Sequence, residues 1–240
     1  WLSRKAVVDI GLLDGKYINH LSTTALFSRG CPFSCHFCAN KKLTFGPVRF
    51  RSPKLIEREI EYLKKDYGIS ALALKDDNSI PVNVKIARPM LEAIGRTNIK
   101  WRGQSRASGV HPDMVKLAKE SGCVDIALGI DSASQEVLRI SNKTINLNEA
   151  KKYIRLLRET DIGVRLHFII GLPGEPDNIV EQTIAFIDES GPRSVLLSYL
   201  CPLPGSEFFD NPRRFGINIT TRDWSQYTLT AGRFKADEFP

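Results

Sequence analysis

The sequence predicts an α/β protein in which helices cover a parallel sheet. Six short apolar runs alternate with amphipathic segments along the chain, and runs of this kind are typical of parallel strands that are buried on both faces. Polar residues, glycines and prolines follow nearly every run, at the edge where ligands gather in both open sheets and barrels. The alternation alone fits a doubly wound sheet and a barrel equally well.

The individual elements follow from these runs and from the residues that end them. We expect strands at residues 22–28, 71–74, 100–104, 125–130, 164–170 and 195–200. We expect helices at about 53–67, 82–96, 112–121, 134–140, 147–160 and 176–189. The first helix is the best marked, because Ser52 suits an N-cap, Pro53 the first turn and Gly68 the stop.

Composition limits the classes of protein that this chain can represent. It has 240 residues, of which 42% are hydrophobic and 25% charged, as in ordinary soluble domains. No apolar run approaches the roughly 18 to 20 residues of a membrane span, and no secretory signal is visible. The net charge is 34 − 27 = +7, but the basic residues are scattered. We therefore interpret them as a solvated surface and do not expect nucleic-acid binding.

Three of the five cysteines stand in one Cys-x3-Cys-x2-Cys stretch, as Cys31, Cys35 and Cys38. No fourth cysteine follows nearby, whereas a structural zinc site and an ordinary four-iron cluster both need four protein ligands. Three thiolates on a cubane cluster would leave one iron open to a small molecule. The crowding and the odd count argue against a disulfide framework and favour reduced thiols in the cytoplasm.

The cysteine stretch, with Phe37 before its last cysteine, resembles the metal-binding motif of radical S-adenosylmethionine (SAM) enzymes. The resemblance covers roughly residues 22–210 and is nearest to the branch that usually carries an upstream cobalamin-binding domain. The motifs shared with that branch are Arg29-Gly30-Cys31, Asp76-Asp77, Gly129-Ile130-Asp131-Ser132, the Gly171 to Glu175 turn and Pro202-Leu203-Pro204-Gly205. Two departures are Asp131, where the branch commonly has glutamate, and Cys201 and Ser206, where it more often has threonines.

The resemblance implies a partial, laterally open (β/α)6 barrel of the TIM type. It also implies three parts of the chain: residues 1–21 as the linker from an upstream domain, 22–205 as the radical SAM core, and 206–240 as an irregular C-terminal extension. Since the sequence begins with Trp1, we expect it to continue upstream in the parent protein. In the extension, Trp224 and Tyr227 are expected to pack back on the core.

The activity that the resemblance implies starts from a [4Fe-4S] cluster. Cys31, Cys35 and Cys38 would each bind one iron, and the fourth iron would chelate the amine and carboxylate of SAM. Reductive cleavage of SAM would give a 5′-deoxyadenosyl radical that abstracts hydrogen from a small-molecule or peptide substrate. Methyl transfer or cyclisation would use cobalamin from a domain outside this chain. The expected reductant is a flavodoxin- or ferredoxin-like protein.

Six further residues are expected to bind the cofactors: Phe37, Asp76, Asp77, Asp131, Ser132 and Gly171. Phe37 would place the loop backbone near the adenine, as in the family. Asp76 or Asp77 could accept from the methionyl ammonium or cap the following helix. Asp131 could accept from the ribose hydroxyls or the ammonium of SAM, or cap the helix that follows it. Gly171 could allow a close backbone approach or serve a plain turn.

Four other polar residues deserve a prediction. Gln104 and Arg106 could face the substrate at the end of their strand. His167 is expected on the opposite face of its strand from Leu166, towards a barrel lumen. His36 lies between two cysteines but is not expected to bind the metal, because neighbours in a tight loop rarely point at one site. No catalytic side chain is assigned.

Two alternatives from other classes remain at this stage. A zinc-binding interaction module would use His36 or a distant residue as its fourth ligand. An iron–sulfur electron carrier would use the cluster without SAM. The long β/α scaffold speaks against the first and the missing fourth cysteine against the second.

Overall fold

A computed structural model describes residues 20–44, 47–108 and 111–227. Its main feature is a parallel sheet of six strands in the order β1-β4-β5-β6-β7-β8. The strands are β1 (Ser22–Ala25), β4 (Ala71–Leu74), β5 (Lys100–Arg106), β6 (Cys123–Asp131), β7 (Gly163–Ile170) and β8 (Ser194–Tyr199). All six predicted strands are confirmed. β5, β6 and β7 extend one or two residues beyond the predicted bounds, β4 agrees with them, β8 is shifted by one residue, and β1 ends at Ala25, three residues before the predicted end.

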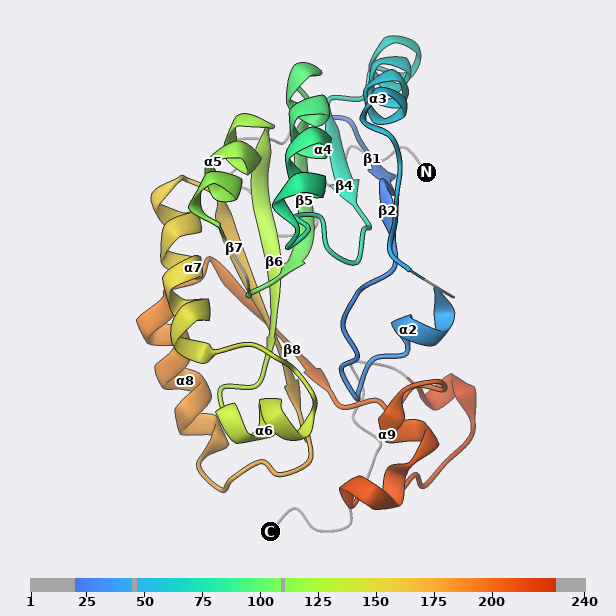
Figure 1. The fold of residues 1–240 in the computed structure, drawn as a ribbon. Helices are drawn as coiled ribbons and strands as arrows, with labels where there is room; N and C mark the ends of the chain where they lie inside the picture. Colours follow the sequence, from blue (N-terminus) through green and yellow to red (C-terminus); the bar gives the residue numbers. More distant parts are fainter. Residues whose placement is uncertain (1–19, 45–46, 109–110, 228–240) are drawn as a thin grey trace.

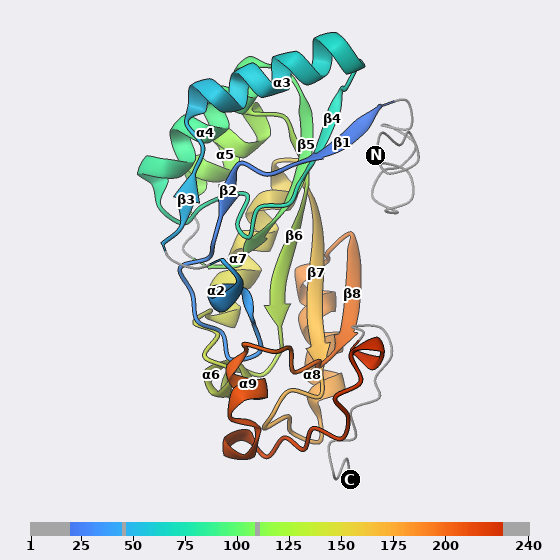
Figure 2. The same ribbon diagram turned by 90° about the vertical axis from the view of Figure 1, so that its right-hand side faces the viewer.

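The sheet is open, because its order follows the chain and β1 and β8 are its two edges. All five pairings between neighbouring strands are parallel, as right-handed β-α-β crossovers produce. The expectation of a partial, laterally open barrel is confirmed. In Figure 2 the arrows of β6 and β7 point towards the end of the molecule where α2, α6 and α9 lie.

Five longer helices cover one face of this sheet (Figure 1). They are α3 (Pro53–Tyr67), α4 (Val84–Arg96), α5 (Pro112–Glu120), α7 (Leu147–Glu159) and α8 (Ile179–Ser190). α3 begins as predicted, since the Ser52 side chain accepts from the amide of Leu55, and it ends at Gly68 with a φ of 64°. A side chain there would be strained, which explains the glycine. Within the described residues, no helix has the length and apolar character to cross a membrane.

The hydrophobic core lies between the helices and the strands. Ile126 and Leu128 of β6, with Leu166 and Phe168 of β7, point into it and are almost completely buried. Trp101 is fully buried, and its indole nitrogen donates to the Ser121 carbonyl at 3.1 Å, so its polar atom is satisfied. Because strand side chains alternate, the residues between these point to the opposite, concave face.

Several short elements were not predicted. The two-residue strands β2 (Ser28–Arg29) and β3 (Arg49–Phe50) pair antiparallel, and they flank the cysteine stretch and α2 (Asn40–Leu43). The six-residue helix α6 (Gln135–Ile140), in contrast, was expected at residues 134–140.

The C-terminal extension is less irregular than the sequence suggests. It contains α9 (Glu207–Asp210) and the 3₁₀ helices η1 (Pro212–Phe215) and η2 (Trp224–Gln226). Phe208 is fully buried, and Trp224 contacts Tyr227 with ring centroids 4.9 Å apart. Residues 228–240, and residues 1–19 of the predicted linker, lie outside the described residues.

Candidate functional site

The cysteine stretch is held on one side by the two acidic residues that follow β4. The carboxylate of Asp76 is buried and accepts from the Phe27 amide at 3.2 Å and the Ser28 hydroxyl at 2.6 Å. Asp77 accepts from the amide of Gly30 at 2.8 Å. Burial raises the pKa of Asp76, although these donors oppose the shift. Both side chains therefore have partners in the segment that leads into the cysteines, and neither caps α4, which Asn83 caps.

Gly30 connects β2 to the first cysteine of the motif. Its φ is 101°, a conformation that costs little only for glycine. A Cβ there would also lie 3.3 Å from Cα of Val48. The glycine in Arg29-Gly30-Cys31 is thus required by the backbone.

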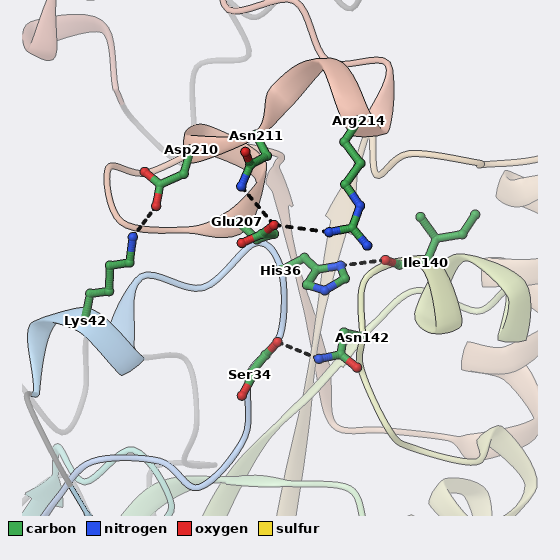
Figure 3. A network of polar contacts seen from close by, with 9 residues as sticks. All are labelled: Ser34, His36, Lys42, Ile140, Asn142, Glu207, Asp210, Asn211 and Arg214. Atoms are coloured by element: carbon green, nitrogen blue, oxygen red, sulfur yellow. Dashed lines mark hydrogen bonds and ion pairs between the residues drawn. The ribbon is translucent and has the colours of Figure 1, made fainter.

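On the other side, α6 and the C-terminal segment hold the same stretch (Figure 3). The His36 ring nitrogen Nδ1 lies 2.8 Å from the Ile140 carbonyl, and the His36 carbonyl accepts from the Phe208 amide at 3.0 Å. Asn142 donates to the Ser34 carbonyl at 2.8 Å. His36 also packs on Phe215, with ring centroids 5.1 Å apart. The structure therefore gives His36 an anchoring role; that it does not bind the metal stays a prediction.

Each of the three cysteine sulfurs lies near one N–H donor, and the three donors come from three different segments of the chain. Nδ2 of Asn78 lies 3.4 Å from Cys31 Sγ. Nη1 of Arg106 lies 3.3 Å from Cys35 Sγ. The amide of Asn40 lies 3.4 Å from Cys38 Sγ. Donors at these distances stabilise negative charge on sulfur, as they do around thiolate ligands of clusters.

The donor set fits an iron–sulfur cluster better than a single metal ion. In the part of the chain that the structure describes, no three His, Cys, Asp or Glu side chains are placed to hold one ion. A cubane does not need such convergence, because each thiolate binds a different iron. Desolvation raises the pKa of the Cys38 thiol, and the nearby Cys35 and Cys31 add to this rise. The two cysteines outside the motif, Cys123 and Cys201, are both buried.

Asp131 lies at the end of β6 and forms a buried ion pair with Lys143. Its φ of 70° is unusual for a residue with a side chain, and the register with β7 shifts between Gly129 and Asp131. Strained backbone of this kind is concentrated at functional sites. Lys143 Nζ also lies 5.8 Å from the centroid of the Phe37 ring. The pair therefore stands beside the cysteine stretch.

Asp131 does not cap the next helix, since Ser134 accepts from the Val137 amide in that role. Ser132 is buried, and its hydroxyl accepts from the Ser134 amide at 3.1 Å. The sequence analysis missed Lys143. The signal that could have revealed it is a lysine one short helix after an acidic strand end, in a fold that turns such residues back towards that strand.

In the turn from Gly171 to Glu175, the carboxylate of Glu175 accepts hydrogen bonds from the first residues of the same turn. The amides of Gly171 and Leu172 donate to Glu175 at 3.0 to 3.1 Å, and burial raises the pKa of Glu175 against these donors. The φ of Gly174 is 80°, and a Cβ there would lie 2.4 Å from the Ile140 side chain. The glycines thus serve a tight turn packed on α6.

Arg106 is more firmly held than the sequence suggests. It is 6% exposed, with Nε 3.1 Å from the Ser108 hydroxyl and Nη2 3.1 Å from the Thr144 hydroxyl. The guanidinium carbon lies 3.8 Å from the centroid of the Phe33 ring. These contacts aim Nη1 at Cys35.

Comparison with known proteins identifies the family. Residues 26–187 match the profile of the radical SAM superfamily. This chain belongs to the radical SAM superfamily. Members of the superfamily use a [4Fe-4S] cluster and SAM, so the resemblance drawn from the cysteine motif is confirmed and the zinc-module and electron-carrier alternatives are not favoured.

Its relatives include cyclases and methyltransferases. An anaerobic magnesium-protoporphyrin IX monomethyl ester cyclase from Cereibacter sphaeroides is 32% identical over 207 residues, which are 84% of this chain and 33% of the cyclase. A bacteriochlorophyllide d C-8(2)-methyltransferase from Chlorobaculum tepidum is 23% identical over 222 residues, 88% of this chain and 49% of that enzyme. The chain thus spans between 33% and 49% of these two relatives.

A solved structure has the same fold. The radical SAM methyltransferase TsrM from Kitasatospora setae, with cobalamin and a [4Fe-4S] cluster bound, superposes with a TM-score of 0.69 at 19% identity. The match covers 78% of this chain and 36% of TsrM. At this identity it supports the fold alone.

Proposed function

We propose that Cys31, Cys35 and Cys38 hold the [4Fe-4S] cluster of this radical SAM domain. The observation that carries the proposal is the set of three sulfurs, each facing an N–H donor, with the Asp131–Lys143 pair beside them. When bound, the cluster and SAM supply radical chemistry that no side chain can supply.

We assign SAM binding to the surroundings of the Asp131–Lys143 pair. The methionyl part of SAM carries an ammonium and a carboxylate. The carboxylate of Asp131 is opposite in charge to the first and the ammonium of Lys143 to the second. Phe37 lies within reach of Lys143 and supplies an apolar wall. Ser132 supports the pair by shaping the turn after β6, and Gly171 supports it by closing the turn after β7.

Asp76 and Asp77 fit a positioning role. Their carboxylates already accept from the backbone before and within the cysteine stretch, so they fix where the cysteines start. This leaves Asp131 as the carboxylate best placed for SAM.

The reaction that the whole protein performs is proposed from its relatives. Methyl transfer or cyclisation, with cobalamin held by a domain outside this chain, fits relatives that include a cyclase and a methyltransferase. Radical SAM enzymes need a reductant, for which a flavodoxin- or ferredoxin-like protein is proposed; such carriers are often acidic, which would suit the net charge of +7. Reduced cysteine ligands favour a cytoplasmic location.

The cluster assignment is tested by anaerobic reconstitution of single variants. Replacing Cys31, Cys35 or Cys38 with Ala should abolish iron and sulfide binding, whereas Cys123→Ala, a change at a buried cysteine at the amino end of β6, should leave both intact. Reduced wild-type protein should convert SAM to methionine and 5′-deoxyadenosine. Uptake of zinc without iron and sulfide would refute the assignment.

The SAM assignment is tested by Asp131→Asn, which keeps the size of the side chain and removes its charge. Equilibrium binding of SAM to the reconstituted variant should weaken by about tenfold or more, consistent with about 1.4 kcal/mol or more for a charge-assisted hydrogen bond. Iron content should not change. Unchanged SAM affinity would exclude Asp131 from the SAM site.

A further inference from the structure

A cleft lies along the β1 edge of the sheet, beside the start of the cysteine stretch. It has a volume of about 620 Å³ and is lined by residues 24–29, residues 49–51, Glu59 and Lys75; we call it the β1-edge cleft. In Figure 2 the pair of short strands β2 and β3 lies between β1 and α2, and α2 follows the last cysteine of the motif. The lining reaches to two residues before Cys31, and none of it belongs to the site assigned to SAM.

The β1-edge cleft contains two exposed cations, Arg29 and Lys75. Neither side chain has a hydrogen-bond or ion-pair partner among the residues that the structure describes. Arg29 stands directly opposite Arg49 in the antiparallel pairing of β2 with β3, so the strand pairing gives it no partner of opposite charge. Arg49 has partners of its own, among them the Thr44 carbonyl, to which it donates at 2.9 Å. The charges that remain available to a binding partner are therefore those of Arg29 and Lys75.

The carboxylates in and beside the cleft already have other partners. Glu59 forms an ion pair with Arg51. Asp76 is buried, and Asp77 accepts from the amide of Gly30 at 2.8 Å, so both are directed towards the backbone that leads into the cysteines. The unpaired charge that this surface presents to solvent is positive, and it favours a negatively charged partner.

Apolar side chains complete the lining of the β1-edge cleft. Leu26 and Phe50 are half-buried there, between the two unpaired cations and the sheet edge. An apolar centre with a polar rim is the usual arrangement of a protein–protein interface. A flavodoxin-type electron carrier exposes the apolar edge of its flavin among acidic side chains, so its surface is complementary to this cleft in both charge and polarity.

We propose that the β1-edge cleft is the docking surface for an acidic flavodoxin-type electron donor. Arg29 and Lys75 contact the acidic rim of the donor, and Leu26 and Phe50 contact its apolar edge. The donor then lies against the segment that leads into Cys31. One electron leaves the donor, which is oxidised, and enters the cluster proposed for the cysteine stretch, which is reduced. This inference rests on the proposed function, because it names the partner that reduces the same cluster and the surface that binds it.

The test compares two electron donors on anaerobically reconstituted protein, and the loss of visible cluster absorbance gives the rate of reduction. One donor is a reduced acidic flavodoxin, and the other is photoreduced deazariboflavin, which is small and uncharged. The informative variant combines Arg29→Gln with Lys75→Gln, which removes two exposed charges and no hydrogen bond between described residues. The matched control combines Lys100→Gln with Arg155→Gln, two exposed cations at the amino end of β5 and on α7.

The expected result is a loss of rate with flavodoxin alone. At low ionic strength, flavodoxin should reduce the informative variant about tenfold more slowly than wild type, because both charges steer the acidic donor to the cleft. Deazariboflavin should reduce the two proteins at the same rate, and the control variant should match wild type with either donor. At about 1 M salt, where the Debye length is about 3 Å, the advantage of wild type with flavodoxin should disappear.

Three outcomes would overturn the inference: flavodoxin reduces the informative variant as fast as wild type, the control variant is slowed as much, or the informative variant is slowed equally with both donors. Titration calorimetry with oxidised flavodoxin measures docking directly and needs no cluster. Wild type should bind about tenfold more tightly than the informative variant, and absent binding or equal affinities would also overturn the inference. If wild-type protein assembles no cluster, the proposed function fails, while the calorimetry still decides whether the docking surface exists.

Discussion

Replacing Arg106 should make the cluster harder to reduce. The Arg106 guanidinium is buried, stacked 3.8 Å from the Phe33 ring centroid, and held by Ser108 and Thr144. Nη1 lies 3.3 Å from Cys35 Sγ. Reduction adds one negative charge to the cluster, and a fixed positive charge nearby favours the reduced form. Arg106→Gln removes that charge and should shift the midpoint potential to more negative values.

The size of the shift follows from Coulomb's law. If the added electron lies about 7 Å from the guanidinium, an effective dielectric constant of about 20 to 40 gives about 1.2 to 2.4 kcal/mol. A tenfold change in the reduction equilibrium corresponds to about 1.4 kcal/mol, or about 59 mV for one electron, so the expected shift is about 50 to 100 mV.

The assay is a redox titration of reconstituted protein, followed by the electron paramagnetic resonance signal of the reduced cluster. Arg106→Lys keeps the charge without the fork and should shift the potential less than Arg106→Gln. Arg155→Gln, far out on α7, controls for net charge and should not shift it. If Arg106→Gln holds a full cluster and its potential is unchanged or less negative, the guanidinium does not act on the cluster as argued.

Three further predictions concern stability and are measured by urea unfolding of the protein without its cluster. Arg165→Ala should lower the free energy of unfolding by about 3 to 5 kcal/mol, because it leaves Asp125 buried without its hydrogen-bonded cation; a loss below about 1 kcal/mol would contradict this, by the scale of exposed pairs. Ser28→Ala should cost about 1 to 2 kcal/mol, because Asp76 loses its 2.6 Å donor, and no loss would show that solvent replaces the hydroxyl. Burial lowers the folded-state pKa of His167, so the unfolded chain binds more protons than the folded chain as the pH falls. The free energy of unfolding should therefore be highest above the unfolded pKa of about 6.5 and should decrease below it, by up to about 1.4 kcal/mol per pH unit. His167→Gln should remove this part of the pH dependence, and identical profiles for both proteins would refute it.

The main elements could be predicted from the sequence because they follow from local chemistry. Apolar runs marked all six strands, and Ser52, Pro53 and Gly68 marked both ends of α3. The cysteine spacing named the family. Elements with little local signal were missed: β2 and β3 are two residues each and form only because their chain segments meet.

Roles of side chains were harder to predict than positions. The Asp76-Asp77 pair was expected at the site and is there, but only the structure shows that both carboxylates accept from the loop backbone. Lys143 was missed because its partner Asp131 is 12 residues away on a different element, and only the return of the chain towards β6 could have linked the two residues. Whether Asp131 and the other five residues bind the cofactors stays a prediction.

The two sides of the cysteine stretch are completed at very different times during synthesis. Asp76 and Asp77 follow the cysteines closely, but Asn142 and Phe208, which bind the backbone at Ser34 and His36, are 108 and 172 residues further along. During synthesis, chains grow from the amino end at about 5 to 20 residues per second. The three thiols are therefore exposed on an unfinished loop for about 10 to 30 seconds before their scaffold is complete. On the proposed assignment, we expect iron and sulfide to be inserted after the C-terminal segment has been made, and the thiols to need a reducing environment until then.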